Sequence, residues 1–270
     1  VPTHVNAPFY AELIARAARR RDMLKLADAA RELAYDESTD LNVVLDSVQM
    51  QLADVSAQAR RGGVVGLSEL VEIAIRQVER RMEGEMPLTL TTGMIDLDHK
   101  LDGGWWRGKV HYVMARTHNG KSLVAKNTAL SAARAGVPTM IISTEIPRDD
   151  LMHELIAIEA GLPSYLVKPG QLSGAQFGAL LEAATRVNRM PLVIVSSRTL
   201  SAAELQTLVE ENVRTHDVQL VVVDYLQNMY APPYKFKSKV DQIDYFSRSI
   251  VTITQRLNVA MVVTSQVNRQ

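Results

Sequence analysis

The sequence predicts an α/β fold with a mostly parallel sheet, preceded by an α-helical hairpin and a linker helix. From Leu88 onward, short apolar runs rich in β-branched residues alternate with helical stretches, which is typical of βαβ units. The first of these runs leads into a Gly-Lys-Ser turn that opens a helix. Before Leu88, apolar residues recur only at the spacing of helices. These observations favour a sheet-based domain with a helical segment in front of it.

Composition narrows the classes of protein to which the chain can belong. Its 270 residues include no cysteine, which excludes disulfides, thiolate metal sites and cysteine nucleophiles. Thirty lysines and arginines balance thirty aspartates and glutamates, so the overall charge does not indicate a nucleic-acid partner. No apolar run approaches the roughly 18 residues that span a membrane. We expect one large domain and a smaller appendage, cut at both ends from a longer cytoplasmic protein.

Residues 1–55 are expected to form an antiparallel helical hairpin. A strong apolar stripe occupies one helical face between Leu41 and Val55, and a weaker stripe precedes it. The acidic segment Asp36–Asp40 is the expected turn between the two helices. The basic cluster at Arg16 and Arg19–Arg21 is either a solvated face or a docking surface for a partner.

Residues 56–87 are expected to form a linker that carries an amphipathic helix. Ser68 can cap this helix, which ends near Met82 and has one apolar stripe. The helix either packs on its own domain or docks on another surface, such as a neighbouring subunit.

Residues 88–270 are expected to form the α/β domain. Ligands of such sheets bind beyond the carboxyl ends of the strands, so functional residues should follow the strands directly. The expected strands are Val110–Met114, Thr139–Ser143, Leu192–Val195, Leu220–Val223 and Ala260–Thr264. The expected helices lie near 123–135, 149–160, 174–187, 202–216 and 240–257.

The turn after the first strand has the composition of a phosphate-binding loop. Backbone N–H groups of such a turn point at phosphates, and the dipole of the following helix adds positive potential. Lys121 would reach the β- and γ-phosphates, and the Ser122 hydroxyl would bind Mg²⁺. A glycine turn followed by a solvated lysine is the structural alternative. The predicted nucleotide-binding residues are Ala115, Arg116, Thr117, His118, Asn119, Gly120, Lys121, Ser122 and, further along the chain, Asp224.

Polar side chains end three other expected strands. Asp224 follows four apolar residues, where a carboxylate is costly to hold unless it faces a cation such as Mg²⁺. Glu145 is the candidate general base that orients water for hydrolysis of a γ-phosphate. Gln266 can donate its amide to that phosphate, which makes Glu145, Lys121 and Gln266 the predicted catalytic residues. A helix cap, a surface acid and a polar strand end are the respective alternatives for Asp224, Glu145 and Gln266.

The segment Tyr230–Lys239 interleaves basic and aromatic residues. Lysines can neutralise backbone phosphates and aromatic rings can stack on bases, so Lys235, Lys237 and Lys239 are predicted to bind DNA. A solvated surface loop is the alternative. Trp105 and Trp106 are expected to pack in the core or between subunits.

Several motifs in fixed order resemble the motor domain of replicative DNA helicases of the DnaB type. The resemblance covers almost the whole chain, and Ala-Arg at the start of the phosphate loop is common in that family. His118, Asn119 and Thr144 depart mildly from its pattern. The motifs are Thr92-Gly93-Met94-Ile95-Asp96-Leu97-Asp98, Gly103-Gly104, Ala115 to Ser122, Ser143-Thr144-Glu145-Ile146-Pro147, Asp224-Tyr225-Leu226-Gln227 and Ser265-Gln266-Val267-Asn268-Arg269.

The resemblance implies a RecA-like P-loop NTPase core that binds ATP and Mg²⁺ in a homo-hexameric ring. The ring would translocate on single-stranded DNA and unwind duplex at the replication fork, in the cytoplasm of a bacterial or phage-infected cell. A primase and a helicase loader are the implied partners. The family's arginine finger follows the last motif by many residues, so we expect it beyond Gln270. A RecA-like recombinase-type ATPase and a helicase-loading or scaffold module that binds ATP without turnover are the rival hypotheses.

Overall fold

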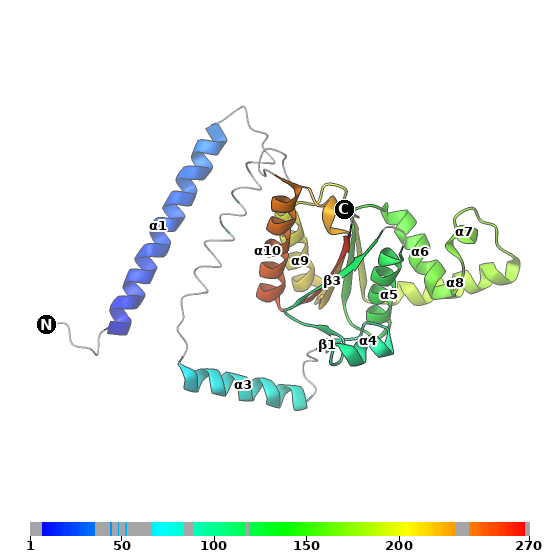
Figure 1. Ribbon diagram of the computed structural model, residues 1–270, viewed down its shortest axis with the longest axis horizontal. Coiled ribbons are helices and arrows are strands. Elements are labelled where there is room, and N and C mark those ends of the chain that lie inside the picture. Colours follow the sequence, from blue (N-terminus) through cyan, green and yellow to red (C-terminus); the bar gives the residue numbers. More distant parts are fainter. Residues whose placement is uncertain are drawn as a thin grey trace. The chain divides into compact units, whose positions relative to one another are not determined.

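The computed structural model describes residues 7–35, 44, 48, 52, 66–83, 89–116, 119–230 and 238–267. The chain divides into two compact units, Val1–Glu85 and Met86–Gln270. Figure 1 shows helices in the first unit and a sheet flanked by helices in the second. None of the described helices is long and apolar enough to cross a membrane.

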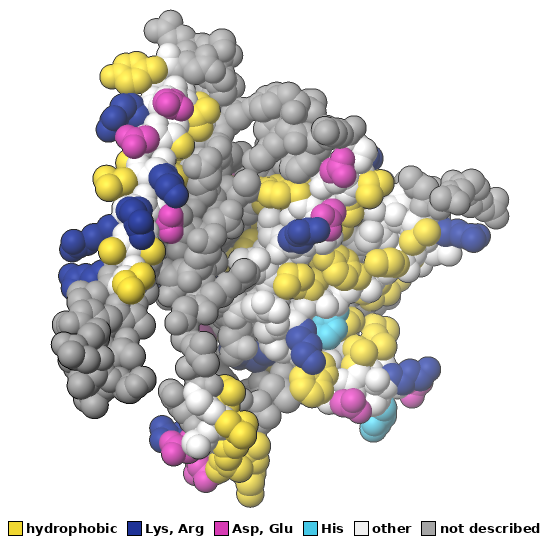
Figure 2. Space-filling view, turned by 60° about the vertical axis from the view of Figure 1, so that its left-hand side comes forward, with side chains coloured by type: hydrophobic (Ala, Val, Ile, Leu, Met, Phe, Trp, Pro, Cys, Tyr) yellow, Lys and Arg dark blue, Asp and Glu magenta, His cyan; other side chains and the backbone are white. Residues whose placement is uncertain are grey.

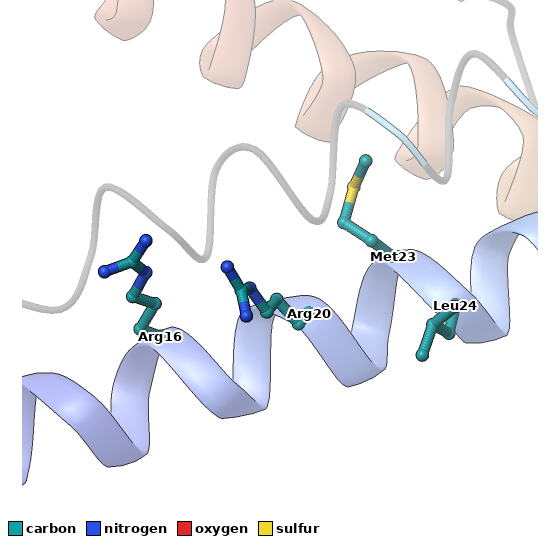
Figure 3. A pocket seen from close by; sticks show the side chains of 4 residues that line it. All are labelled: Arg16, Arg20, Met23 and Leu24. Carbon is teal, nitrogen blue, oxygen red and sulfur yellow. The ribbon is translucent and has the colours of Figure 1, made fainter.

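The first unit contains the long helix α1 (Ala7–Tyr35) and the shorter helix α3 (Leu67–Met82). Of the expected second helix of the hairpin, the structure describes Val44, Val48 and Leu52, and all three are helical. Arg16 and Arg20 of the basic cluster are exposed and, with Met23 and Leu24, line a hollow on α1 (Figure 3).

Helix α3 is strongly amphipathic, as its sequence predicts. Its exposed hydrophobic side chains gather along one side of the helix in the space-filling view (Figure 2). The predicted cap at Ser68 is wrong, because the helix begins one residue before it. The Gly66 carbonyl accepts a hydrogen bond of 3.0 Å from the Leu70 N–H, which places Ser68 inside the first turn.

The second unit is built on a five-stranded sheet in which all neighbouring strands are parallel. The order across the sheet is β3-β7-β6-β4-β5, so the last strand in the chain lies beside the first strand of this sheet. The predicted α/β fold with a parallel sheet is therefore confirmed. The strands are β3 (Val110–Ala115), β4 (Thr139–Ser143), β5 (Leu192–Ser196), β6 (Leu220–Asp224) and β7 (Ala260–Gln266).

Helices cover both faces of this sheet (Figure 1). Alternate residues of β6 point to opposite faces, as strand geometry requires. Val221 and Val223 join a core with α9 (Ala202–His216) and α10 (Lys239–Leu257). Leu220 and Val222 join a second core on the other face. The helices of that face are α5 (Lys121–Arg134), α6 (Arg148–Ala160) and α8 (Gly174–Asn188).

Several short elements were not predicted from the sequence. Two-residue strands form a small antiparallel sheet in which Leu90 pairs with Trp105. Gly104 has a φ of +118°, and a Cβ there would lie 2.2 Å from the Leu90 carbonyl oxygen, so this strand pair requires glycine at this position. Trp105 is buried in the core, as expected. The short elements are β1 (Thr89–Leu90), α4 (Ile95–Lys100), β2 (Trp105–Trp106), α7 (Ser164–Val167) and the 3₁₀ turn η2 (Leu226–Asn228).

Candidate functional site

A cavity of about 240 Å³ lies where four strands of the sheet end. It brings together side chains that follow β3, β4 and β6 with the last residue of β7, although these segments are far apart in the sequence. Its position at the carboxyl edge of the sheet is the position that parallel sheets give to ligands. The lining residues are Arg116, Gly120, Lys121, Ser122, Leu123, Glu145, Tyr225 and Gln266.

The turn between β3 and α5 forms one wall of the cavity. Gly120 precedes the helix in a left-handed conformation with a φ of +79°. This backbone conformation favours glycine, even though a side chain would find open space there. The N–H groups of the first helical turn, from Lys121 to Leu123, have no carbonyl of the same helix to bind. They contribute positive potential at the helix start, so this wall fits an anionic phosphate. Thr117 and His118 lie outside the described residues.

Lys121 lies against an aromatic ring that the sequence analysis did not single out. Its Nζ atom is 4.4 Å from the ring centroid of Tyr225, within the range of a cation–π interaction. Burial raises the pKa of the Tyr225 hydroxyl, and the negative charge of Glu145 raises it further. The ring therefore stays neutral and holds the Lys121 ammonium group at the cavity. The sequence signals for Tyr225 were its place directly after Asp224 and its position in the motif Asp224-Tyr225-Leu226-Gln227.

Asp224 ends β6 and is almost completely buried, with 4% of its surface exposed. Its Oδ1 atom accepts a hydrogen bond of 2.5 Å from the Thr264 hydroxyl on β7. No lysine or arginine among the described residues forms an ion pair with it. Asp224 does not line the cavity itself, but the next residue, Tyr225, does.

A magnesium ion fits this donor set. A buried carboxylate without a basic partner is costly unless a cation compensates it, and oxygen atoms are the ligands that Mg²⁺ prefers. Ser122 offers a hydroxyl at the cavity and Asp224 a carboxylate behind it. The described residues contain no cluster of three or more metal-binding side chains. A site with few protein ligands suits Mg²⁺, which usually completes its coordination with water and phosphate oxygens.

Glu145 follows β4 and presents an exposed carboxylate at the cavity. The Ser143 hydroxyl accepts hydrogen bonds from the N–H groups of Glu145 and Ile146, at 3.4 and 2.9 Å, and so fixes the turn. The Thr144 N–H donates to the Asp224 carbonyl at 2.8 Å. These bonds hold the Glu145 backbone against the end of β6, which suits a carboxylate that must face a reacting water.

Gln266 ends β7 and also lines the cavity. It lies opposite Ala115 in the parallel register of β3 and β7, so it stands beside the strand that leads into the phosphate turn. The sequence placed Gln266 after a strand, but only the strand order shows that this strand neighbours β3.

Some predicted residues do not reach the cavity. Ala115 and Asn119 flank it without lining it, and the Asn119 N–H instead donates to the Arg116 carbonyl at 3.2 Å. Lys239 is the exposed first residue of α10. Lys235 and Lys237 lie outside the described residues. DNA binding by Lys235, Lys237 and Lys239 therefore stays a prediction.

Comparison with known proteins agrees with this geometry. The family model of the DnaB-like helicase C terminal domain matches residues 89–270. A replicative DNA helicase DnaB of Treponema pallidum (strain Nichols) is 28% identical over all of this chain and 61% of that protein. Its counterpart from Leifsonia xyli subsp. xyli (strain CTCB07) is 26% identical over all of this chain and 59% of that protein. The chain thus spans about three-fifths of the length of these two relatives.

A solved structure shares the fold. It is described as a DnaB-like replicative helicase and its interactions with primase, and it aligns with a TM-score of 0.66 and 17% identity. The alignment covers the whole of this chain and 63% of that one. With its phosphate turn, its parallel sheet and a family match over two-thirds of its length, the chain belongs to the DnaB-like helicase C-terminal domain family.

Proposed function

We propose that this chain is the ATP-driven motor part of a replicative DNA helicase, which works as a homo-hexameric ring that translocates on single-stranded DNA. The observation that carries the proposal is the cavity at the strand ends, where Lys121 and Ser122 of the phosphate turn face Glu145 and Gln266. Relatives named replicative DNA helicase DnaB support the biological role.

ATP and Mg²⁺ are the proposed ligands of the cavity. The N–H groups at the start of α5 bind the phosphates, and Lys121 neutralises the β- and γ-phosphates. The Ser122 hydroxyl and Asp224, the latter directly or through water, would hold Mg²⁺, which would supply positive charge against the phosphate oxygens. Lys121 would leave the Tyr225 ring for the phosphates, since a full negative charge attracts the ammonium group more strongly than a ring face does.

Glu145 and Gln266 supply the remaining groups. The Glu145 carboxylate accepts a proton from the attacking water and orients its lone pair toward the γ-phosphorus. The Gln266 amide donates to the γ-phosphate, so that it distinguishes ATP from ADP. Both groups come from strands on opposite sides of β6, and therefore any movement between β4 and β7 would change the geometry of hydrolysis.

Single-stranded DNA is the proposed polymer substrate, contacted by Lys235, Lys237 and Lys239. A primase and a helicase loader are the proposed protein partners, and the cytoplasm is the proposed compartment. The solved relative described with primase supports the first of these partners.

The proposal is tested with the complete protein and DNA-stimulated ATP hydrolysis. We expect Glu145→Gln to keep ATP binding and to lower kcat by about 10²–10⁴-fold, the usual contribution of a general base. Lys121→Ala should instead lose affinity for ATP. Glu182→Gln, which changes an exposed acid on α8, is the matched control and should leave both quantities unchanged. DNA-stimulated hydrolysis that survives both site substitutions would contradict the proposal.

A further inference from the structure

The turn after β6 contacts each of the other three strand ends of the cavity. Tyr225 lies against Lys121, which follows β3. The Asn228 side chain donates to the Thr144 carbonyl beside Glu145, at 3.4 Å. Gln227 contacts the end of β7, where Gln266 lies. The turn therefore touches the surroundings of Lys121, Glu145 and Gln266 together.

Gln227 makes the most extensive of these contacts. Its Nε2 atom donates to the Gln266 carbonyl at 2.9 Å and to the Ser265 hydroxyl at 2.8 Å. Its Oε1 atom accepts from the Gln266 N–H at 3.1 Å. A side-chain amide has the same donor and acceptor as a peptide group, so it can satisfy both backbone groups of one residue.

The Gln227 amide binds β7 at a point where β6 no longer pairs with it. The ladder between β6 and β7 ends at Val223 and Val263, whereas β7 continues to Gln266 alongside β3. Within the described residues, the pairing of β6 with β7 does not extend past Val263. The Gln227 amide lies beyond this point and fixes the Gln266 backbone on the side opposite β3.

We propose that Gln227 is a positioning residue of the nucleotide site, which holds the Gln266 backbone so that the Gln266 amide meets the γ-phosphate. The inference rests on the proposed function. An ATP-specific contact needs its donor placed to within a fraction of an ångström, and at Gln266 the paired strand β3 holds β7 from one side only. Three hydrogen bonds from one short turn hold the other side.

The first test replaces Gln227 by Leu in the complete protein, which removes all three hydrogen bonds at similar side-chain size. We expect kcat for ATP hydrolysis to fall by about 10- to 100-fold. The Kd for ADP should stay within about twofold, because the phosphate turn and Lys121 are untouched, whereas the affinity for the triphosphate should fall. Gln206→Leu, the same change at a half-buried glutamine of α9, is the matched control and should retain wild-type kcat.

A double-mutant cycle separates positioning from general damage. If Gln227 acts through Gln266, Gln227→Leu should have little further effect on kcat in a Gln266→Ala background. The ratio of ATPγS to ADP affinity should also fall to the same value in both single variants. Gln227→Glu keeps the acceptor but loses both donor bonds, and it supplies the same test if the Leu variant fails to bind ADP.

Equal losses of kcat in the presence and absence of the Gln266 side chain would overturn the inference. So would a Gln227→Leu variant with unchanged kcat in a protein that hydrolyses ATP. Failure of the unsubstituted protein to hydrolyse ATP would instead overturn the proposed function, and the inference with it. The two failures are thus distinguished by the unsubstituted protein.

Discussion

The two compact units differ in how far their apolar side chains are buried. In Met86–Gln270, the four apolar residues of β6 are completely buried and helices cover both faces of the sheet. In Val1–Glu85, helix α1 exposes 65% of Leu24 and helix α3 exposes 79% of Leu67. The second unit therefore has an extensive core of its own, whereas α1 and α3 present large apolar side chains at the surface.

Matched leucine substitutions give the largest expected contrast between the units. Leu205→Ala on α9 removes a fully buried side chain and should lower the free energy of unfolding of the second unit by about 2–5 kcal/mol. Leu24→Ala on α1 should change it by less than about 0.5 kcal/mol, because that side chain is exposed. Both tryptophans, Trp105 and Trp106, belong to the second unit, so tryptophan fluorescence during denaturant unfolding measures this unit.

The control for this comparison is the slope of the unfolding transition. It should be the same for both variants and the unsubstituted chain, which shows that the same unit unfolds in each case. A loss of more than about 1 kcal/mol for Leu24→Ala would contradict the exposed position of Leu24.

The same contrast explains how much of the fold could be predicted from the sequence. Strands β4 and β6 each span five residues with an apolar run inside them, and their predicted bounds lie within one residue of the structure. The two-residue strands β1 and β2 are too short to show any period, so this strand pair was missed. The order of the strands in the sheet could not be predicted from single segments either. It depends on how the helices that connect the strands pack against one another.

The candidate site was predicted unevenly for a similar reason. Glu145 and Gln266 were found because polar residues directly follow apolar strands, and the structure places both at the cavity. Gln227 was named only as part of the motif Asp224-Tyr225-Leu226-Gln227 and its role was missed, because nothing in the sequence shows that its amide would bind the backbone of another strand. The role of Tyr225 was missed likewise, since its relation to Lys121 exists only after β3 and β6 are placed in the sheet.

Charge provides a second, smaller contrast. Lys126 of α5 and Lys168 contact the half-buried Glu154 of α6 at 2.5 and 3.2 Å. Burial raises the pKa of the Glu154 carboxyl, but the hydrogen bonds and charges of the two lysines outweigh this and hold the pKa below its usual value. A lowered pKa means that the pair stabilises the second unit above the ordinary glutamate pKa of about 4.3 and loses this effect as the pH falls through the folded-state pKa.

We expect the free energy of unfolding of the second unit to fall between pH 5 and pH 3, and Glu154→Gln to reduce this fall by about 1 kcal/mol. At pH 7 the variant should be less stable than the unsubstituted chain, since Lys126 is then left partly buried without its partner. Denaturant unfolding at several pH values, followed by tryptophan fluorescence, measures both effects. A variant with the same pH dependence as the unsubstituted chain would show that the pair adds nothing.

The smallest expected effect concerns exposed ion pairs, of which each unit has one within a helix that can be compared. Glu72 and Arg76 on α3 are 3.4 Å apart, and Asp244 and Arg248 on α10 are 2.9 Å apart, each with the acid four residues before the base. Solvent screens both pairs, so Glu72→Gln and Asp244→Asn should each cost no more than about 0.5 kcal/mol. Circular dichroism at 222 nm follows all helices, including α3, whereas tryptophan fluorescence follows only the unit that contains α10, so a change seen by circular dichroism alone lies in the helices of the first unit. Equal, small effects would show that burial of side chains, and not the presence of ion pairs, separates the two units; a large effect in α3 alone would mean that its surface charges, rather than a core, hold that helix together.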